Sequence, residues 1–152
     1  VGEVNVTDAM SASGAFLGIE GSSGGIIYPA ISMCRDSYAA MALVLDMLAA
    51  GEQSIDTLLE TLPRLASVSR KVICPSAQTG VNALRTIRER RKDRNPITVD
   101  GVRIDLDDGA WVLLRRSNTE PVIRILAESS DPASAEKLAG EFERELQGLL
   151  KK

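Results

Sequence analysis

Apolar residues in the first part of the chain come in short runs separated by glycine and serine. The segments AFLGIE (residues 15–20) and IIYP (26–29) have the β-branched and aromatic composition of strands. Helices are expected after Thr7, from Asp36 or Ser37 to Gly51, and from Ser54 to Pro63, with either Asp36 or Ser37 as the cap of the second. Two short strands and three helices predict an incomplete α/β segment.

The second part has a more regular pattern. KVIC (71–74) predicts a strand, and residues 76–92 predict a helix with Val81, Leu84 and Ile87 on one face. Strands are expected within 97–115, divided by Asp-Gly turns, and again over 121–129. A last helix should begin after Asp131, with core positions Leu138, Phe142, Leu146 and Leu149. This order predicts a small α+β domain with helices on one face of a largely antiparallel sheet.

Charge changes sign between these two parts. The first 66 residues carry a clear excess of acids, and the remainder carries a slight excess of bases. We therefore expect an incomplete α/β segment over residues 1–66 and an α+β domain over residues 67–152.

Composition places the chain among soluble globular proteins, with 44% hydrophobic and 26% charged residues. The longest apolar run, 38–50, is interrupted by Asp46 and is too short for a membrane span, and residues 1–10 do not resemble a signal peptide. Cys34 and Cys74 lie far apart and are interpreted as reduced structural thiols, so a cytoplasmic location is expected. The absence of histidine removes the commonest general base and metal ligand.

The loop RRSNTEP (115–121) lies between two expected strands. Arg115, Ser117, Asn118 and Thr119 supply a guanidinium, two hydroxyls and an amide, a set that suits an anion such as phosphate. The alternative is a polar turn whose hydroxyls cap their own backbone. Arg124, on the following strand, either adds a second guanidinium to the anion or faces solvent.

This loop resembles the phosphate-binding signature R-x-S-[NG]-T-E-P in the C-terminal domain of the α-D-phosphohexomutases. Residues 99–115 and the last helix are also similar to that domain. VGEVNVTDAM (1–10) and GIEGSSGGIIYP (18–29) resemble the family's third domain and its sugar-binding loop. The resemblance implies that Glu20 and either Ser22 or Ser23 contact sugar hydroxyls. The loop has one small residue more than the common pattern, so the choice of serine stays open.

The resemblance covers only the last part of a four-domain enzyme. It implies a parent that interconverts hexose 1-phosphate and hexose 6-phosphate through a phosphoserine and a bisphosphate intermediate, with Mg²⁺ as cofactor. The phosphoserine and metal loops have no counterpart here, and a strand end and turn explain the aspartates of IDLDDGA (104–110) better than metal ligation. The implied partners are a hexose phosphate of undetermined identity and the parent's N-terminal domains. Without those domains this chain is predicted to be inactive.

The sequence also suggests two other functions. The C-terminal part could stand alone as an anion-binding or interaction module, because its expected elements make a complete small domain. The stripe Arg85, Arg88, Arg91 and Lys92 could bind nucleic acid, but it lacks interleaved aromatic residues and the chain has a pI of about 5.1, so we expect no nucleic-acid partner. Trp111 is predicted to be a core residue rather than a stacking platform.

Overall fold

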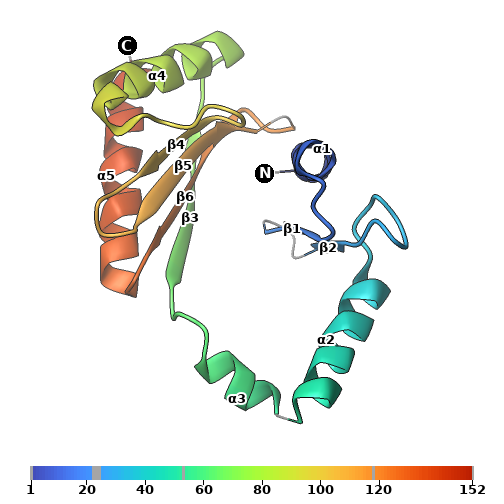
Figure 1. The fold of residues 1–152 in the computed structure, drawn as a ribbon. Coiled ribbons are helices and arrows are strands. Elements are labelled where there is room, and N and C mark those ends of the chain that lie inside the picture. Colours follow the sequence, from blue (N-terminus) through green and yellow to red (C-terminus); the bar gives the residue numbers. More distant parts are fainter. Residues whose placement is uncertain (1, 22–24, 53, 118, 152) are drawn as a thin grey trace. The chain divides into compact units, whose positions relative to one another are not determined.

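The computed structural model describes residues 2–21, 25–52, 54–117 and 119–151. The chain forms two compact units, Val1–Leu62 and Pro63–Lys152 (Figure 1). The observed boundary follows Leu62 and so lies slightly before the boundary after residue 66 that the change in charge predicts.

The described residues of unit 1 form three helices and a two-stranded antiparallel sheet. Its elements are, in order, α1 (Glu3–Ser13), β1 (Gly18–Glu20), β2 (Gly25–Ile27), α2 (Ser37–Gly51) and α3 (Ile55–Glu60). The expectation that the first helix begins after Thr7 is wrong, because α1 already begins at Glu3. The second helix is capped by Asp36, whose carboxylate accepts the N–H groups of Tyr38 and Ala39 and so satisfies donors that a helix start leaves unpaired.

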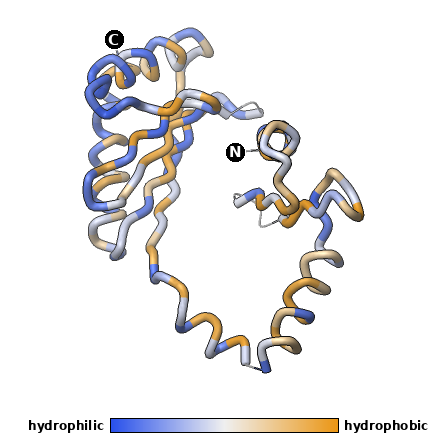
Figure 2. Tube along the Cα trace, viewed as in Figure 1, coloured by the Kyte–Doolittle hydropathy of each residue, from blue (hydrophilic) through white to orange (hydrophobic). Residues whose placement is uncertain are grey.

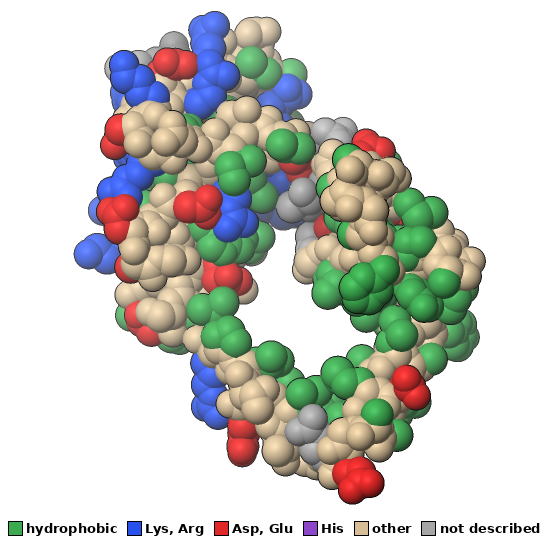
Figure 3. Space-filling model, viewed as in Figure 1, with side chains coloured by type: hydrophobic (Ala, Val, Ile, Leu, Met, Phe, Trp, Pro, Cys, Tyr) green, Lys and Arg blue, Asp and Glu red, His purple; other side chains and the backbone are tan. Residues whose placement is uncertain are grey.

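Unit 1 buries few large side chains. Met10 and Ile27 are buried, whereas α2 exposes Tyr38, Met41 and Leu45, with 83%, 53% and 66% of their surface accessible. Figure 2 shows that α2 is apolar along most of its length, and Figure 3 shows hydrophobic side chains at its surface. An apolar surface on this scale is what remains when a segment lacks the elements that would cover it.

Unit 2 is a four-stranded antiparallel sheet with two helices on one face (Figure 1). The strands are β3 (Ala66–Ile73), β4 (Val102–Asp105), β5 (Trp111–Arg116) and β6 (Val122–Ser129), in the order β3-β6-β5-β4. Helix α4 (Ala77–Arg90), followed by the 3-10 turn η1 (Lys92–Arg94), and helix α5 (Pro132–Leu150) pack on the sheet. This arrangement confirms the α+β fold class.

The core of unit 2 lies between the sheet and the two helices. Alternate residues of β5 and β6, including Val112, Leu114, Ile123 and Ile125, point into it and are completely buried. From α5, the expected residues Leu138, Phe142 and Leu146 are buried in the same core. Val81 is the exception on α4: it is 41% exposed, so its assignment to the buried face is wrong. The helical turn places Ala83, Leu84 and Ile87 inward instead.

The opposite face of the sheet carries charged side chains such as Arg115 and Arg124 together with the apolar Leu113 and Leu126. Trp111 belongs to this face and is half-buried, so the prediction that it is a core residue is wrong. Its indole N–H donates to Glu128 Oε1 at 2.9 Å, and the guanidinium of Arg103 lies 4.3 Å from the ring centre. Because residues alternate across a strand, Val112 and Leu114 take the core positions on β5 and leave Trp111 on the open face.

Candidate phosphate-binding site and sugar-loop region

The two arginines that begin the polar loop lie on opposite faces of β5. Arg115 is paired with Arg124 of β6, and Arg116 is paired with the buried Ile123. Side chains alternate between the faces of a strand, so Arg115 and Arg124 share the open face while Arg116 points toward the helix side. The structure therefore brings together the two guanidinium groups that the sequence analysis associated with the anion.

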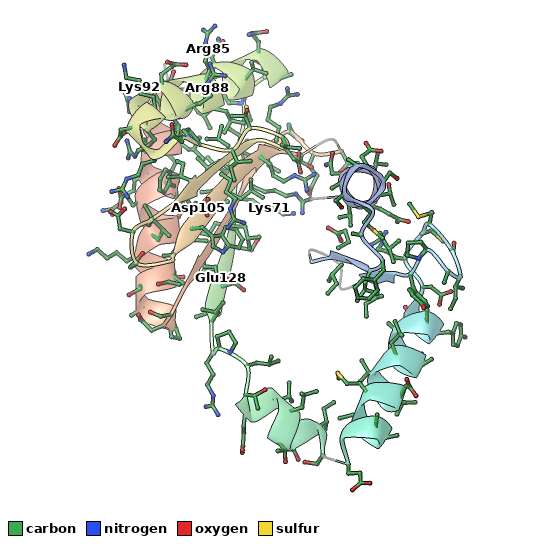
Figure 4. All side chains as sticks on the ribbon, in the orientation of Figure 1. Lys71, Arg85, Arg88, Lys92, Asp105 and Glu128 are labelled. Atoms are coloured by element: carbon green, nitrogen blue, oxygen red, sulfur yellow. The ribbon has the colours of Figure 1, made fainter. Side chains whose placement is uncertain are left out.

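A third cation extends this row. Lys71 of β3 is paired with Arg124, which places Lys71, Arg124 and Arg115 side by side across three strands of one face. Figure 4 labels Lys71 on β3. Lys71 comes from a segment far from the loop in sequence, and the sequence analysis did not include it in the site.

The loop after Arg115 is stabilised by its own hydroxyl groups. The N–H of Ser117 donates to the carbonyl of Val122 at 2.9 Å, and Ser117 Oγ accepts the N–H groups of Thr119 at 3.4 Å and Glu120 at 3.2 Å. The self-capping interpretation of these hydroxyls is thus realised for Ser117, whose own O–H can still donate to an anion. Asn118 lies outside the described residues.

The side chain of Arg115 lies close to an acidic side chain, and its Nε keeps unused hydrogen-bonding capacity. Its Nε lies 3.6 Å from Asp100 Oδ2, and this buried Nε has no hydrogen-bond acceptor among the described residues. The bend before β4 brings the acid there, since Gly101 has φ +89° and packs on Arg115 and the Leu114 carbonyl with no room for a Cβ atom. Asp100 also escaped the sequence analysis, although its Asp-Gly turn was predicted.

Glu120 is the anion closest to the row of cations. Its two carboxylate oxygens each lie 3.1 Å from Lys71 Nζ, and Oε2 lies 2.5 Å from an Arg124 nitrogen. The ammonium of Lys71, and more weakly Arg124, lower the pKa of Glu120 below its usual value. The site therefore contains an ionised carboxylate where the sequence analysis expected only donors.

In unit 1, Glu20 ends β1 and is buried, with 2% of its surface accessible. Its carboxylate accepts the N–H of Gly2 at 3.2 Å and lies 3.8 Å from an Arg35 nitrogen. Arg35 also binds Glu3, whose pKa is lowered by that hydrogen bond. Ser22 and Ser23 lie outside the described residues, so within unit 1 the structure describes only Glu20 of the expected sugar contacts.

Comparison with known families matches both units separately. Residues 70–145 match the C-terminal domain of phosphoglucomutase/phosphomannomutase, and residues 1–65 match the alpha/beta/alpha domain III of the same family. The chain belongs to the phosphoglucomutase/phosphomannomutase family. This confirms the resemblance drawn from the loop RRSNTEP and its surroundings.

Curated relatives of this family member are mutases. A probable phosphoglucosamine mutase of Methanopyrus kandleri is 35% identical over 93% of this chain and 31% of its own length. A phosphoglucosamine/phosphogalactosamine mutase of Sulfurisphaera tokodaii is 33% identical over 97% of this chain and 32% of its own length. The chain thus spans about a third of the length of these relatives.

A solved structure supports the fold. A phosphoglucomutase/phosphomannomutase family protein from Burkholderia thailandensis superposes with a TM-score of 0.73 and 24% identity, covering 98% of this chain and 31% of that protein.

Among the described residues, no helix has the length and apolarity needed to cross a bilayer. Both cysteines are free thiols, with Cys74 buried and Cys34 exposed.

The aspartates of IDLDDGA (104–110) each have a local partner. Asp105 pairs with Arg103, Asp107 pairs with Arg94, and Asp108 accepts the N–H of Ala110. Across the described ranges, no group of three or more His, Cys, Asp or Glu residues is arranged to hold a metal ion. Local ion pairs and a turn account for these carboxylates.

Two residues of the basic stripe on α4, Arg88 and Arg91, are paired with acids. Arg88 pairs with Glu89, and Arg91 pairs with Glu145 and stacks on Phe142. Arg85, Arg88 and Lys92 are labelled in Figure 4 on α4 and the turn that follows it. The Arg91–Glu145 pair joins the end of α4 to α5, whereas the Arg88–Glu89 pair lies within α4. The expectation of no nucleic-acid partner stays a prediction.

Proposed function

We propose that this chain is the substrate-recognition part of a phosphohexomutase that interconverts a sugar 1-phosphate and a sugar 6-phosphate through a phosphoserine and a bisphosphate intermediate. Unit 2 binds the phosphate that is not being transferred. The observation that carries this proposal is the pairing of Arg115 with Arg124 on one face of the sheet, beside a loop that contains the hydroxyl groups of Ser117 and Thr119. Guanidinium groups bind phosphate oxygens through pairs of charge-assisted hydrogen bonds.

Such an anion site suits a reaction in which either phosphate must be held in turn. Its donors recognise the charge and oxygens of a phosphate but not the sugar carbon that carries it. Phosphoryl transfer depends mostly on positioning and electrostatic stabilisation, so a fixed grip on the non-reacting phosphate aligns the other one. Sugar hydroxyls are recognised by the loop after β1, through Glu20 and Ser22 or Ser23.

The names of the relatives support a hexosamine phosphate as the substrate of the parent protein. Two of them are described as a probable phosphoglucosamine mutase and a phosphoglucosamine/phosphogalactosamine mutase. Mg²⁺ and the phosphoserine belong to the parent's N-terminal domains, so this chain binds substrate without turning it over. Detection of mutase turnover by the isolated chain would contradict that division of labour.

The test is an amide NMR titration with glucosamine 6-phosphate and, separately, inorganic phosphate. Shifts should centre on Arg115 to Glu120, and Arg115→Ala should weaken binding at least about tenfold, because hydrogen bonds to charged groups contribute about 1.5–3 kcal/mol. Arg85→Ala removes the same charge from the exposed surface of α4 and should leave the affinity unchanged. Equal affinities of the wild-type chain and Arg115→Ala would refute the proposal.

A stand-alone anion-binding module is the second candidate. It is favoured by the self-contained core of unit 2, which unit 1 lacks. In that case inorganic phosphate and the sugar phosphate would perturb the same resonances, and none in the region of Glu20.

A further inference from the structure

Three cations lie directly beside one another on the open face of unit 2. Lys71, Arg124 and Arg115 are cross-strand neighbours, and like charges in that arrangement repel. The sheet tolerates them because acids lie at both ends of the row: Asp100 near Arg115, and Glu120 against Lys71 and Arg124. The row is therefore partly neutralised before any ligand arrives.

Glu120 is hydrogen-bonded to the loop that follows Arg115. Its backbone N–H donates to Ser117 Oγ, while its carboxylate accepts hydrogen bonds from Lys71 and Arg124. The Arg124 guanidinium thus already has an anionic partner at the loop where a substrate phosphate would bind. A phosphate that takes Arg124 must displace this carboxylate.

We propose, building on the phosphate site of the proposed function, that Glu120 competes with the substrate phosphate for Arg124, and that Lys71 is a positioning residue that retains Glu120 when Arg124 turns to the phosphate. Lys71 then sets the affinity of the site through Glu120 rather than by touching the phosphate.

The exchange is feasible because the pairs are exposed. The side chains of Lys71, Glu120 and Arg124 are 53%, 41% and 42% accessible, and ion pairs at such positions are weak. A phosphate monoester carries more charge than a carboxylate and can bind two guanidinium groups at once. With both carboxylate oxygens of Glu120 equally close to its ammonium, Lys71 can keep the carboxylate after Arg124 leaves.

A double-mutant cycle tests the competition, with inorganic phosphate and glucosamine 6-phosphate as probes at constant ionic strength. Glu120→Gln should tighten phosphate binding about two- to fivefold, the contribution of an exposed pair of this kind. Lys71→Met should weaken binding by a similar factor, because Glu120 then pairs only with Arg124. In the Glu120→Gln background, Lys71→Met should change the affinity less than about twofold, and that loss of effect is the signature of action through Glu120.

Two matched variants control for net charge. Lys92→Met removes an exposed cation at η1, and Glu89→Gln removes a carboxylate that is paired with Arg88 at 2.8 Å. Both should leave phosphate affinity unchanged. Lys71→Arg keeps the cation and should retain the wild-type affinity, and the amide spectrum of each variant reports whether the sheet is intact.

The results that would overturn this inference differ from the result that would overturn the proposed function. Weaker binding by Glu120→Gln, or an equal effect of Lys71→Met in both backgrounds, overturns this inference while the Arg115-dependent site stands. An effect of Lys92→Met equal to that of Lys71→Met shows long-range charge alone and overturns it as well. Absence of phosphate binding by the wild-type chain overturns the proposed function and the inference together.

Discussion

Arg115 and Arg124 are direct cross-strand partners on β5 and β6, on the face of the sheet opposite to α4 and α5. Two guanidinium groups in this position repel each other, so their pairing does not contribute to folding by itself. Placement of like charges side by side is a common feature of sites that bind an opposite charge. If these residues bind an anion as proposed, their replacement should change ligand affinity more than stability.

Arg124→Gln should weaken phosphate binding severalfold and leave the free energy of unfolding within about 0.5 kcal/mol of wild type, as is usual for surface substitutions. Arg124 is half-exposed, and its replacement removes a repulsion from Arg115 together with an attraction to Glu120. Phosphate titration and urea unfolding of the same samples measure both quantities. A large loss of stability would show that Arg124 is structural.

Leucine-to-alanine substitutions should separate the two units. Leu146 on α5 is completely buried, and Leu146→Ala should cost about 2–5 kcal/mol through lost packing and a residual cavity. Leu45 on α2 is 66% exposed, so Leu45→Ala should have an effect below about 0.5 kcal/mol in this chain. If urea unfolding showed equal losses of unfolding free energy for the two variants, this prediction would be contradicted, because Leu45 on α2 would then have to be buried in solution.

Residues 63–152 should fold cooperatively without unit 1, because they contain the whole buried cluster between the sheet and α4 and α5. Residues 1–62 should not, since apolar side chains of α2 remain exposed and few large residues are buried. Thermal unfolding followed by circular dichroism compares the two pieces. A sharp transition in the 1–62 piece would contradict our account of it as incomplete.

Gly101 should be less replaceable than Gly109, although both have positive φ angles, of +89° and +81°. Alanine at Gly109 meets no neighbouring atom and should cost about 1–2 kcal/mol for its left-handed backbone. At Gly101 a Cβ atom would also collide with the Leu114 carbonyl oxygen and with Arg115. Gly101→Ala should therefore destabilise the chain more and also weaken phosphate binding, which Gly109→Ala should not do.

Asp131 should give α5 a pH-dependent contribution to stability. Its carboxylate is hydrogen-bonded by the side chain of Ser134 and accepts the Ser134 backbone N–H, and both interactions lower its pKa below the usual value of 3.8. Because the folded-state pKa is the lower one, the contribution is fully present above about pH 4 and is lost as the pH falls through the folded-state value.

Asp131→Ala should accordingly lower Tm at pH 7, and the difference from wild type should shrink below pH 4. Asp131→Asn keeps a capping oxygen that does not titrate, so it should retain most of the wild-type Tm at pH 7. A Tm difference between wild type and Asp131→Ala that is the same at pH 7 and pH 3 would exclude the capping carboxylate as its source.

Local chemistry in the sequence was sufficient for most of the fold. Asp36, Ser54, Ser76 and Asp131 each cap a helix by accepting N–H groups a few residues ahead, and the Asp-Gly pairs sit at the bends around β4. The motif RRSNTEP predicted the phosphate loop and, with the residues around Glu20, the family. All these signals act over a few residues, so they can be identified without knowledge of the tertiary contacts.

The tertiary structure alone decided which side chains share a face. The pairing of β3 with β6 brings Lys71 to Glu120, 49 residues away in the sequence, and the alternation of β5 directs Arg115 and Trp111 to the open face while Arg116 points the other way. Strand register depends on the burial of apolar residues contributed by distant segments, and a shift of one position would reverse every side chain. The sequence by itself thus determined the elements, the loop and the family, and long-range packing determined the row of cations and the carboxylate that occupies it.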